Sequence, residues 1–170
     1  MVELRTHRLR LRPAVEADLA AFHSILSDPR AMIFWSTPAH SDLQETREWL
    51  AAMIGINAGE GEDFVVEYEG RLIGKAGLYR FPEIGFIFNP DVWGHGFAGE
   101  AVRAVIARAF GHHRLSSIDA DVDPRNAASL RLLARLGFQE VGRARGTWLV
   151  GAEKCDSVYL RLAMEGWEPK

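Results

Sequence analysis

The sequence is poor in cysteine, contains no long apolar run and carries no excess of basic residues. Its single cysteine, Cys155, excludes a disulfide within the chain, and its six histidines lack the spacing of a zinc site, so we expect no metal. No apolar stretch reaches the roughly 18 residues that a membrane helix needs, so we expect no membrane association. The N-terminal segment is charged where a signal peptide is apolar, which predicts a cytoplasmic protein.

The balance of charges and the length of the chain narrow the class of protein. A formal net charge of -3 offers no basic face for phosphates, so we expect no nucleic-acid partner, and it slightly favours a cationic substrate. With 170 residues, of which 48% are hydrophobic, the chain has the size of one globular domain with one core. We therefore expect a single domain over residues 1–170.

The first half of the chain predicts strands and two helices. Alternating apolar and basic residues predict a strand over residues 9–12, and apolar residues at helical spacing predict a helix that includes Leu19 to Leu26. Ser41 and Gln44 indicate a capping box for a second helix that runs to about Asn57. Three further strands are predicted over residues 64–68, 71–79 and 83–88, the first two of them joined by a hairpin turn at Glu69-Gly70.

The second half predicts a strand and a helix in alternation. Apolar residues from Ala101 to Phe110 mark one face of a helix that ends at Gly111. A strand follows over residues 117–122, and Asn126 begins a short helix that Gly137 ends. Two more strands are predicted over residues 138–143 and 157–164. The order predicts an α+β fold around a mixed sheet.

A glycine-rich segment lies between the strand over residues 83–88 and the following helix, and it contains Gly94, Gly96 and Gly99. It could form a tight turn, or it could place the helix N-terminus and its free N–H groups against a pyrophosphate. The three glycines also match the dinucleotide-binding pattern, with Asp119 or Asp121 at about the distance of a ribose contact. Against that alternative, a five-residue loop separates the strand from the first glycine, and little chain remains for a second nucleotide-binding half.

Two sequence signatures, in order, resemble one known family. The first is Ile84-Gly85-Phe86-Ile87-Phe88-Asn89-Pro90-Asp91-Val92-Trp93-Gly94-His95-Gly96-Phe97-Ala98-Gly99-Glu100-Ala101. The second is Asp123-Pro124-Arg125-Asn126-Ala127-Ala128-Ser129, followed by Leu136-Gly137-Phe138. Both resemble the GNAT superfamily of N-acetyltransferases, and within it the branch that includes the ribosomal-protein N-terminal alanine acetyltransferases. Arg8-Leu9-Arg10-Leu11-Arg12-Pro13 and Gly70-Arg71-Leu72-Ile73-Gly74 also fit, so the resemblance covers nearly the whole chain.

The resemblance implies a central, largely antiparallel sheet that splays between its fourth and fifth strands, with acetyl-coenzyme A as co-substrate in the opening. The backbone of the glycine-rich segment would bind the pyrophosphate, and the strand before it would lie along the pantetheine arm. The wider superfamily often has Gln or Arg where this chain has Trp93, which affects a side-chain contact and leaves the backbone cradle intact. The cofactor-binding residues implied are Phe86, Ile87, Phe88, Trp93, Gly94, His95, Gly96, Phe97, Ala98, Gly99 and Asn126.

Acetyl transfer to an amine needs a group to remove the amine proton and a proton donor for the leaving thiolate. By resemblance, Ser129 is the candidate donor. Glu83 is the candidate base, acting directly or through a water. A helix N-cap is the ordinary role of an asparagine such as Asn126, a solvated serine is ordinary at Ser129, and an exposed carboxylate is ordinary at Glu83.

The acceptor pocket, again by resemblance, would be built from Phe34, Trp35, Phe81 and Trp148. A peptide or protein N-terminus and a small-molecule amine both fit the branch, and so does a homodimer, although no residue pattern specifies one. We therefore expect an acetyl-CoA-dependent N-acetyltransferase that works by direct transfer in a ternary complex. The alternatives are a non-catalytic acyl-CoA-binding regulatory domain and an NAD(P)-binding enzyme.

Overall fold

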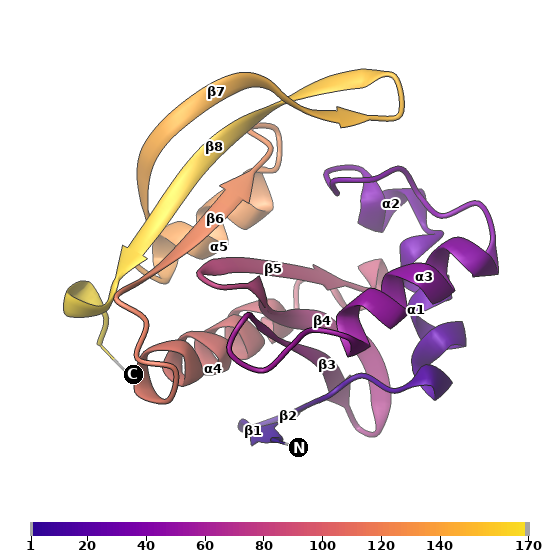
Figure 1. Cartoon of the computed structure of the whole chain (residues 1–170), viewed down its shortest axis with the longest axis horizontal. Helices are drawn as coiled ribbons and strands as arrows, with labels where there is room; N and C mark the ends of the chain where they lie inside the picture. Colours follow the sequence, from indigo (N-terminus) through magenta and orange to yellow (C-terminus); the bar gives the residue numbers. More distant parts are fainter. Residues whose placement is uncertain (1, 169–170) are drawn as a thin grey trace.

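A computed structural model describes residues 2–168, which form one eight-stranded sheet in the order β1-β2-β3-β4-β5-β6-β8-β7 (Figure 1). The strands are β1 (Leu4–Arg5), β2 (Leu9–Arg12), β3 (Glu62–Tyr68), β4 (Arg71–Arg80), β5 (Glu83–Phe88), β6 (Ser117–Val122), β7 (Gln139–Val150) and β8 (Glu153–Ala163). The helices are α1 (Leu19–Leu26), α2 (Pro29–Met32), α3 (Leu43–Ile54), α4 (Phe97–Gly111) and α5 (Ala127–Arg135). No helix within residues 2–168 is long and apolar enough to cross a membrane.

The sheet opens between β5 and β6. These two strands run parallel and share one paired position, Glu83 with Asp119, whereas every other neighbouring pair is antiparallel. Beyond that position the strands diverge, and the β7–β8 hairpin arches over the opening toward α2 (Figure 1). The expected α+β fold, splayed between its fourth and fifth predicted strands, is confirmed; those strands are β5 and β6 because the two-residue β1 precedes them.

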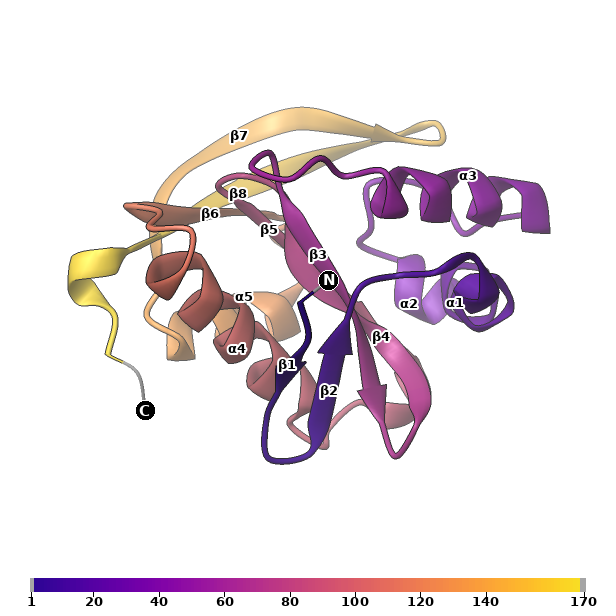
Figure 2. The same cartoon turned by 60° about the horizontal axis from the view of Figure 1, so that its bottom comes forward.

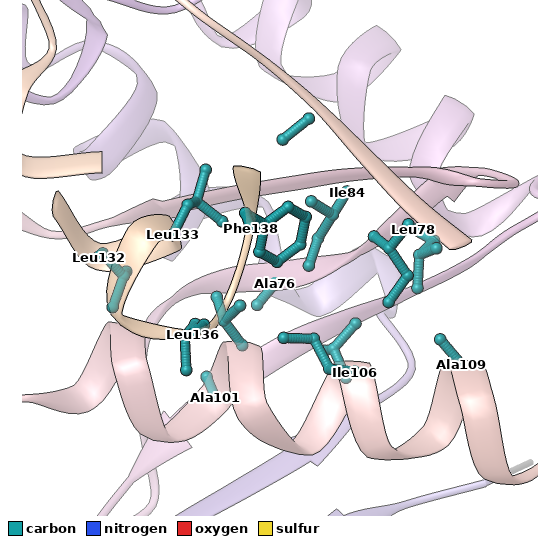
Figure 3. Packing of buried hydrophobic residues seen from close by; sticks show 14 of the residues in the cluster. Ala76, Leu78, Ile84, Ala101, Ile106, Ala109, Leu132, Leu133, Leu136 and Phe138 are labelled. Atoms are coloured by element: carbon teal, nitrogen blue, oxygen red, sulfur yellow. The ribbon is translucent and has the colours of Figure 1, made fainter. Parts of the chain in front are cut away.

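Helices cover both faces of the half-sheet from β2 to β5 (Figure 2). Successive residues of β3 alternate between the two layers: Phe64 and Val66 belong to the core cluster that contains α4, and Val65 belongs to the cluster with α1 and α3. This alternation is the period of two that a strand buried on both faces requires. The larger cluster also includes α5 and β8, and so it continues across the opening (Figure 3).

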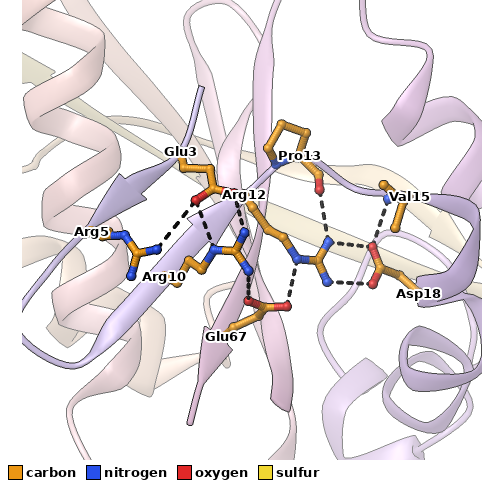
Figure 4. A network of polar contacts seen from close by, with 8 residues as sticks. All are labelled: Glu3, Arg5, Arg10, Arg12, Pro13, Val15, Asp18 and Glu67. Atoms are coloured by element: carbon orange, nitrogen blue, oxygen red, sulfur yellow. Dashed lines mark hydrogen bonds and ion pairs between the residues drawn. The ribbon is translucent and has the colours of Figure 1, made fainter. Parts of the chain in front are cut away.

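Ion pairs fasten the N-terminal strands to the sheet and to the turn before α1 (Figure 4). Arg12 on β2 donates to Asp18 at 2.7 Å and to Glu67 on β3 at 2.7 Å. Arg10 also contacts Glu67, at 3.1 Å, and its guanidinium reaches Glu3 as well. The side chains of Arg12 and Asp18 are only 16% and 8% exposed, so this pair is largely out of water.

The predicted start of the second helix is wrong by one residue. Asp42, not Ser41, is the N-cap of α3, and its carboxylate accepts the backbone N–H of Glu45 at 3.0 Å. Glu45 reaches back to the N–H of Ser41, while Gln44 contacts Glu48 on the helix surface. An Asp at the cap accepts a backbone N–H as well as a Ser does, so the motif alone fits either register. The helix also ends at Ile54, before the predicted end at about Asn57.

Several predicted elements have other bounds. A one-turn helix that was not predicted, α2, follows Asp28 and is capped by the Asp28 carboxylate. β7 and β8 extend to Val150 and back from Glu153, well beyond the predicted 138–143 and 157–164. The extended part is an arm that projects past the sheet (Figure 1). Most of β7 is exposed, so its sequence lacks the apolar alternation of a half-buried strand.

Candidate active site

The glycine-rich segment forms the turn between β5 and α4. Gly94 and Gly96 have φ angles of +81° and +79°, a region that favours glycine, and Gly96 is the N-cap of α4. No side chain within residues 2–168 caps this helix. Arg8 braces the turn, because its guanidinium donates to the His95 carbonyl at 3.0 Å and to Glu100 at 2.8 Å. The 15-residue helix α4 therefore begins without a side-chain cap on its first N–H groups.

A cavity of about 780 Å³ lies against this turn, in the opening between β5 and α5. The structure brings nearly all the predicted cofactor-binding residues to its walls: Phe86, Ile87, Phe88, Trp93, Gly94, Gly96, Phe97, Ala98, Gly99 and Asn126. His95 is the exception, because its Nδ1 lies 3.1 Å and 3.0 Å from the carbonyls of Val92 and Trp93. Its ring stacks on Phe97, so His95 contributes to the turn and does not line the cavity.

Asn126 and Ser129 lie on the first turn of α5. The Asn126 side-chain oxygen accepts the backbone N–H of Ser129 at 3.1 Å, so Asn126 is the N-cap that the sequence allowed as its ordinary role. Both residues also line the cavity beside the glycine turn and a second cavity that adjoins it. Their capping role therefore does not remove them from the opening.

The second cavity has a volume of about 400 Å³ and lies under the β7–β8 arm. The predicted acceptor residues Phe34, Trp35 and Trp148 line it, and the structure adds Trp49 from α3 and Tyr79 from β4. The two cavities meet, because both are lined by Ile33, Phe34, Trp35, Phe86, Asn126 and Ser129. Phe81 lines neither cavity; its ring packs on His113 at 4.7 Å between centroids.

Glu83 reaches the second cavity only through a neighbour. Its carboxylate accepts the phenol O–H of Tyr79, which lines the cavity, and pairs with Arg80 at 2.7 Å. Burial and the hydrogen bond to Glu83 raise the pKa of Tyr79 well above its ordinary value, with a smaller contribution from the charge of Asp121. The phenol is thus neutral at physiological pH, and Glu83 does not itself face either cavity.

A buried ion pair in the wall of this cavity was missed at the sequence level. Lys75 on β4 donates to Asp63 on β3 at 2.8 Å, and both side chains are only 3% exposed. The Lys75 ammonium also lies 5.7 Å and 5.8 Å from the ring centres of Trp35 and Tyr79. A single charge inside the apolar run Leu72-Ile73-Gly74-Lys75-Ala76-Gly77-Leu78 was the available signal, since a buried charge needs a partner.

The β7–β8 arm is tied to both sides of the second cavity. Trp148 on β7 donates its indole N–H to Asp121 on β6 at 2.8 Å. Arg125, just before α5, pairs with Glu153 at the start of β8 at 2.6 Å and lies over the ring of Phe34 at 5.7 Å. The arm is therefore a wall of the cavity and not a free extension.

The comparisons with known proteins agree with this architecture. The family model for an acetyltransferase (GNAT) domain matches residues 8–139. Uncharacterized N-acetyltransferase p20 of Bacillus licheniformis is 31% identical over 155 residues, which cover 85% of this chain and 86% of that protein. The ribosomal protein uS5-alanine N-acetyltransferase of Escherichia coli is 30% identical over 93 residues, 55% of this chain and 48% of that one.

Solved structures share the fold. A spermidine N-acetyltransferase from Vibrio cholerae, crystallised with CoA and spermine, has a TM-score of 0.81 at 23% identity, covering 95% of this chain and 98% of that chain. The family match over residues 8–139, the relatives among N-acetyltransferases and the splayed sheet lead to one conclusion. The chain belongs to the GNAT family of N-acetyltransferases and is an enzyme that transfers an acyl group to an amine.

Proposed function

We propose that residues 1–170 form one N-acetyltransferase domain that moves an acetyl group from acetyl-coenzyme A to a primary amine by direct transfer in a ternary complex. The observation that carries this proposal is the junction of the two cavities, where Phe86, Asn126 and Ser129 line both. A donor in one cavity and an acceptor in the other would meet at these residues. Holding both reactants together removes much of the entropic cost of the reaction and needs no enzyme nucleophile.

The residues of the larger cavity fit coenzyme A. The glycine turn and the uncapped N-terminus of α4 offer backbone N–H groups and the positive end of the helix dipole to a pyrophosphate. β5 pairs with β6 only at Glu83, which leaves the edge from Ile84 to Phe86 unpaired with another strand and able to hydrogen-bond a pantetheine arm like an added strand. Farther along, the Phe88 carbonyl accepts the indole N–H of Trp93 at 3.1 Å. The apolar surface beside that edge comes from Phe86, Ile87 and Phe88.

Acetyl-coenzyme A supplies the acetyl thioester: the amine nitrogen bonds to its carbonyl carbon, the carbon–sulfur bond breaks, the nitrogen loses a proton and the sulfur gains one. Ser129 lies at the junction and would donate the proton to the sulfur. Tyr79 lines the acceptor cavity with its phenol bonded to Glu83, so Glu83 would draw the amine proton away through Tyr79 or a water. Phe81 has no part in this proposal because it packs on His113.

The acceptor is a primary amine of a peptide or protein N-terminus or of a small molecule. One relative carries the name of a ribosomal-protein alanine enzyme and one structural neighbour that of a spermidine enzyme, so the comparisons support both kinds of acceptor. Homodimerisation stays a prediction.

The test compares binding with turnover. Acetyl-CoA should raise the melting temperature of the wild type, since a ligand that binds only the folded state stabilises it, and NAD should not. Ser129→Ala should keep the acetyl-CoA shift but lower kcat for amine acetylation by about 100-fold or more, the usual range for a lost proton donor. Ser24→Ala on α1, whose residue lines neither cavity, is the matched control.

Three other outcomes would change the proposal. Stabilisation by acetyl-CoA with no turnover across a wide panel of amines would favour a non-catalytic acyl-CoA-binding domain. Stabilisation by NAD alone would favour the dinucleotide alternative. Full activity of Glu83→Gln would exclude Glu83 and leave a chain of waters as the path for the amine proton.

A further inference from the structure

We propose that the acceptor is a small amine with a second, protonated nitrogen, and that Asp121 in the aromatic cavity binds this second charge. The inference rests on the proposed function, because it assigns the distal part of the acceptor while Ser129 and the thioester define the reacting end. It concerns the cavity of about 400 Å³ under the β7–β8 arm.

The walls of this cavity are aromatic on several sides. Its six aromatic side chains come from the loop after α2, from α3, from β4, from β5 and from the arm: Phe34, Trp35, Trp49, Tyr79, Phe86 and Trp148. Aromatic faces attract an organic cation more strongly than an anion, because their π clouds carry negative charge. The volume is that of a small ligand, near the lower end of typical small-molecule sites.

The charges in the cavity leave two carboxylates without a cation, and Asp121 is the one whose carboxylate an aromatic residue of the cavity wall holds. Four aspartates line it, and two of them form ion pairs: Asp63 with Lys75 at 2.8 Å, and Asp123 with Arg125 at 2.7 Å. Asp156 accepts the backbone N–H of Gly146 at 2.8 Å. Asp121 accepts only the indole N–H of Trp148, and no ion pair to it forms within residues 2–168.

The hydrogen bond from Trp148 fixes where this carboxylate lies. One oxygen of Asp121 is held by the indole N–H, which orients the carboxylate beside an aromatic ring of the same cavity. A cation bound there would meet a negative charge and the face or edge of the indole together. Arg125 and Lys75, the two cations near the cavity, are already occupied by other carboxylates.

This arrangement separates the two nitrogens of the acceptor. The reacting nitrogen must be neutral and lies at the junction near Ser129, where it loses its proton as the amide bond forms. The distal nitrogen keeps all its protons and binds at Asp121. A monoamine would leave Asp121 without its cation, and an amino acid would place a carboxylate against a carboxylate.

The test uses three acceptors of equal chain length: pentylamine, 1,5-diaminopentane and 5-aminopentanoate. The wild type should show a kcat/KM at least about tenfold higher for the diamine than for pentylamine, the effect of roughly one favourable ion pair, and lowest for 5-aminopentanoate. Asp121→Asn should reduce the diamine preference to nearly one, chiefly by raising KM for the diamine. The acetyl-CoA melting shift should stay as in the wild type.

Asp119→Asn is the matched control. Asp119 lies two residues earlier on β6, pairs with Arg161 at 2.6 Å and lines neither cavity, so it should leave the diamine preference unchanged. Trp148→Phe keeps an aromatic ring but loses the indole donor, and it should lower the preference in part. It also covers the case in which Asp121→Asn fails to fold.

Equal rates for diamine and monoamine in the wild type, or an unchanged preference in Asp121→Asn, would overturn the inference. A strong preference for a peptide N-terminus over the diamine would do the same. These outcomes leave the proposed function standing, because acetyl-CoA would still bind and an amine would still be acetylated. The proposed function fails separately, when acetyl-CoA neither stabilises the protein nor supports acetylation of any of these amines or of peptides.

Discussion

At the scale of single residues, the stability of the N-terminal region depends on Arg12. Replacing it in Arg12→Met should lower the free energy of unfolding by about 3 kcal/mol, because the largely buried Asp18 carboxylate would lose its cation. Arg10→Met is the control; Arg10 is 40% exposed, and its loss should cost about 1 kcal/mol or less. Urea denaturation measures both, and equal losses would contradict the distinction drawn between them.

Single residues were predictable where a local motif fixes their role. Asn126 at the start of α5 and the glycines of the turn before α4 are read from neighbouring residues alone, and the structure places them at the larger cavity. Lys75, Trp49 and Asp121 were missed as cavity residues because their partners lie elsewhere in the sequence. Their environment depends on which strands and helices pack together, and no spacing within one segment carries that information.

At the scale of secondary-structure elements, α1 and the segment before α3 each place a histidine against one hydroxyl of α3. His23 and His40 place their Nδ1 atoms 2.8 Å and 2.9 Å from the hydroxyl of Thr46. Burial is the main cause that lowers the pKa of His40 below its ordinary value of 6.5; the charge of His23 adds to it, while Glu45 and Asp42 oppose it. The folded protein therefore favours neutral His40.

Because the unfolded chain binds the proton on His40 more readily, stability should fall as the pH drops from 6.5 toward the lowered pKa of the folded state. Above pH 6.5 both states are neutral at this residue and the effect is absent. His40→Gln should flatten this part of the curve of melting temperature against pH. The same slope in the variant and the wild type would show that another group is responsible.

The helices and strands that bury one face and expose the other were the easiest to predict from the sequence. The helix α4 buries one clear face, and buried residues alternate along the strand β6; the predicted positions of both are confirmed. The outer half of the β7–β8 hairpin buries little: Leu149 is 66% exposed. Its length follows from pairing between the two strands and from the contacts of Trp148 and Arg125, which the hydrophobic pattern does not encode.

At the scale of the whole molecule, the two parts of the sheet are joined more by side chains than by strand pairing. Phe138 lies beside Leu133 of α5 and Ile84 of β5 in the cluster that crosses the opening (Figure 3). Phe138→Ala should lower the free energy of unfolding by about 3 to 4 kcal/mol through the cavity it leaves. Since the shared core couples both parts, unfolding should still follow one transition.

Val141→Ala is the control for Phe138, because Val141 lies three residues farther along the chain, in β7, but is 59% exposed. It should change the free energy of unfolding by about 0.5 kcal/mol or less. Two separate transitions in the Phe138 variant, seen by fluorescence and circular dichroism at different urea concentrations, would mean that the two parts of the sheet fold independently.

The overall architecture was predicted from the two signatures, because they fix the order of β5, the glycine turn, α4, β6 and α5 along the chain. The position of the opening came with the resemblance and not from periodicity. The shape of the smaller cavity could not be predicted, since it is enclosed by a loop, two helices and an arm whose mutual positions are set by long-range contacts.

New acceptor preferences can arise in this protein with little loss of stability. The turn and strand that face the larger cavity carry core residues such as Phe97 and Phe88, so substitutions there would disturb folding together with the proposed donor site. The arm contributes exposed residues such as Trp148 to the smaller cavity, and Trp148 belongs to neither core cluster. Under the proposed function, descendants of such a chain are therefore free to diversify in the amines they modify while keeping the same acetyl donor.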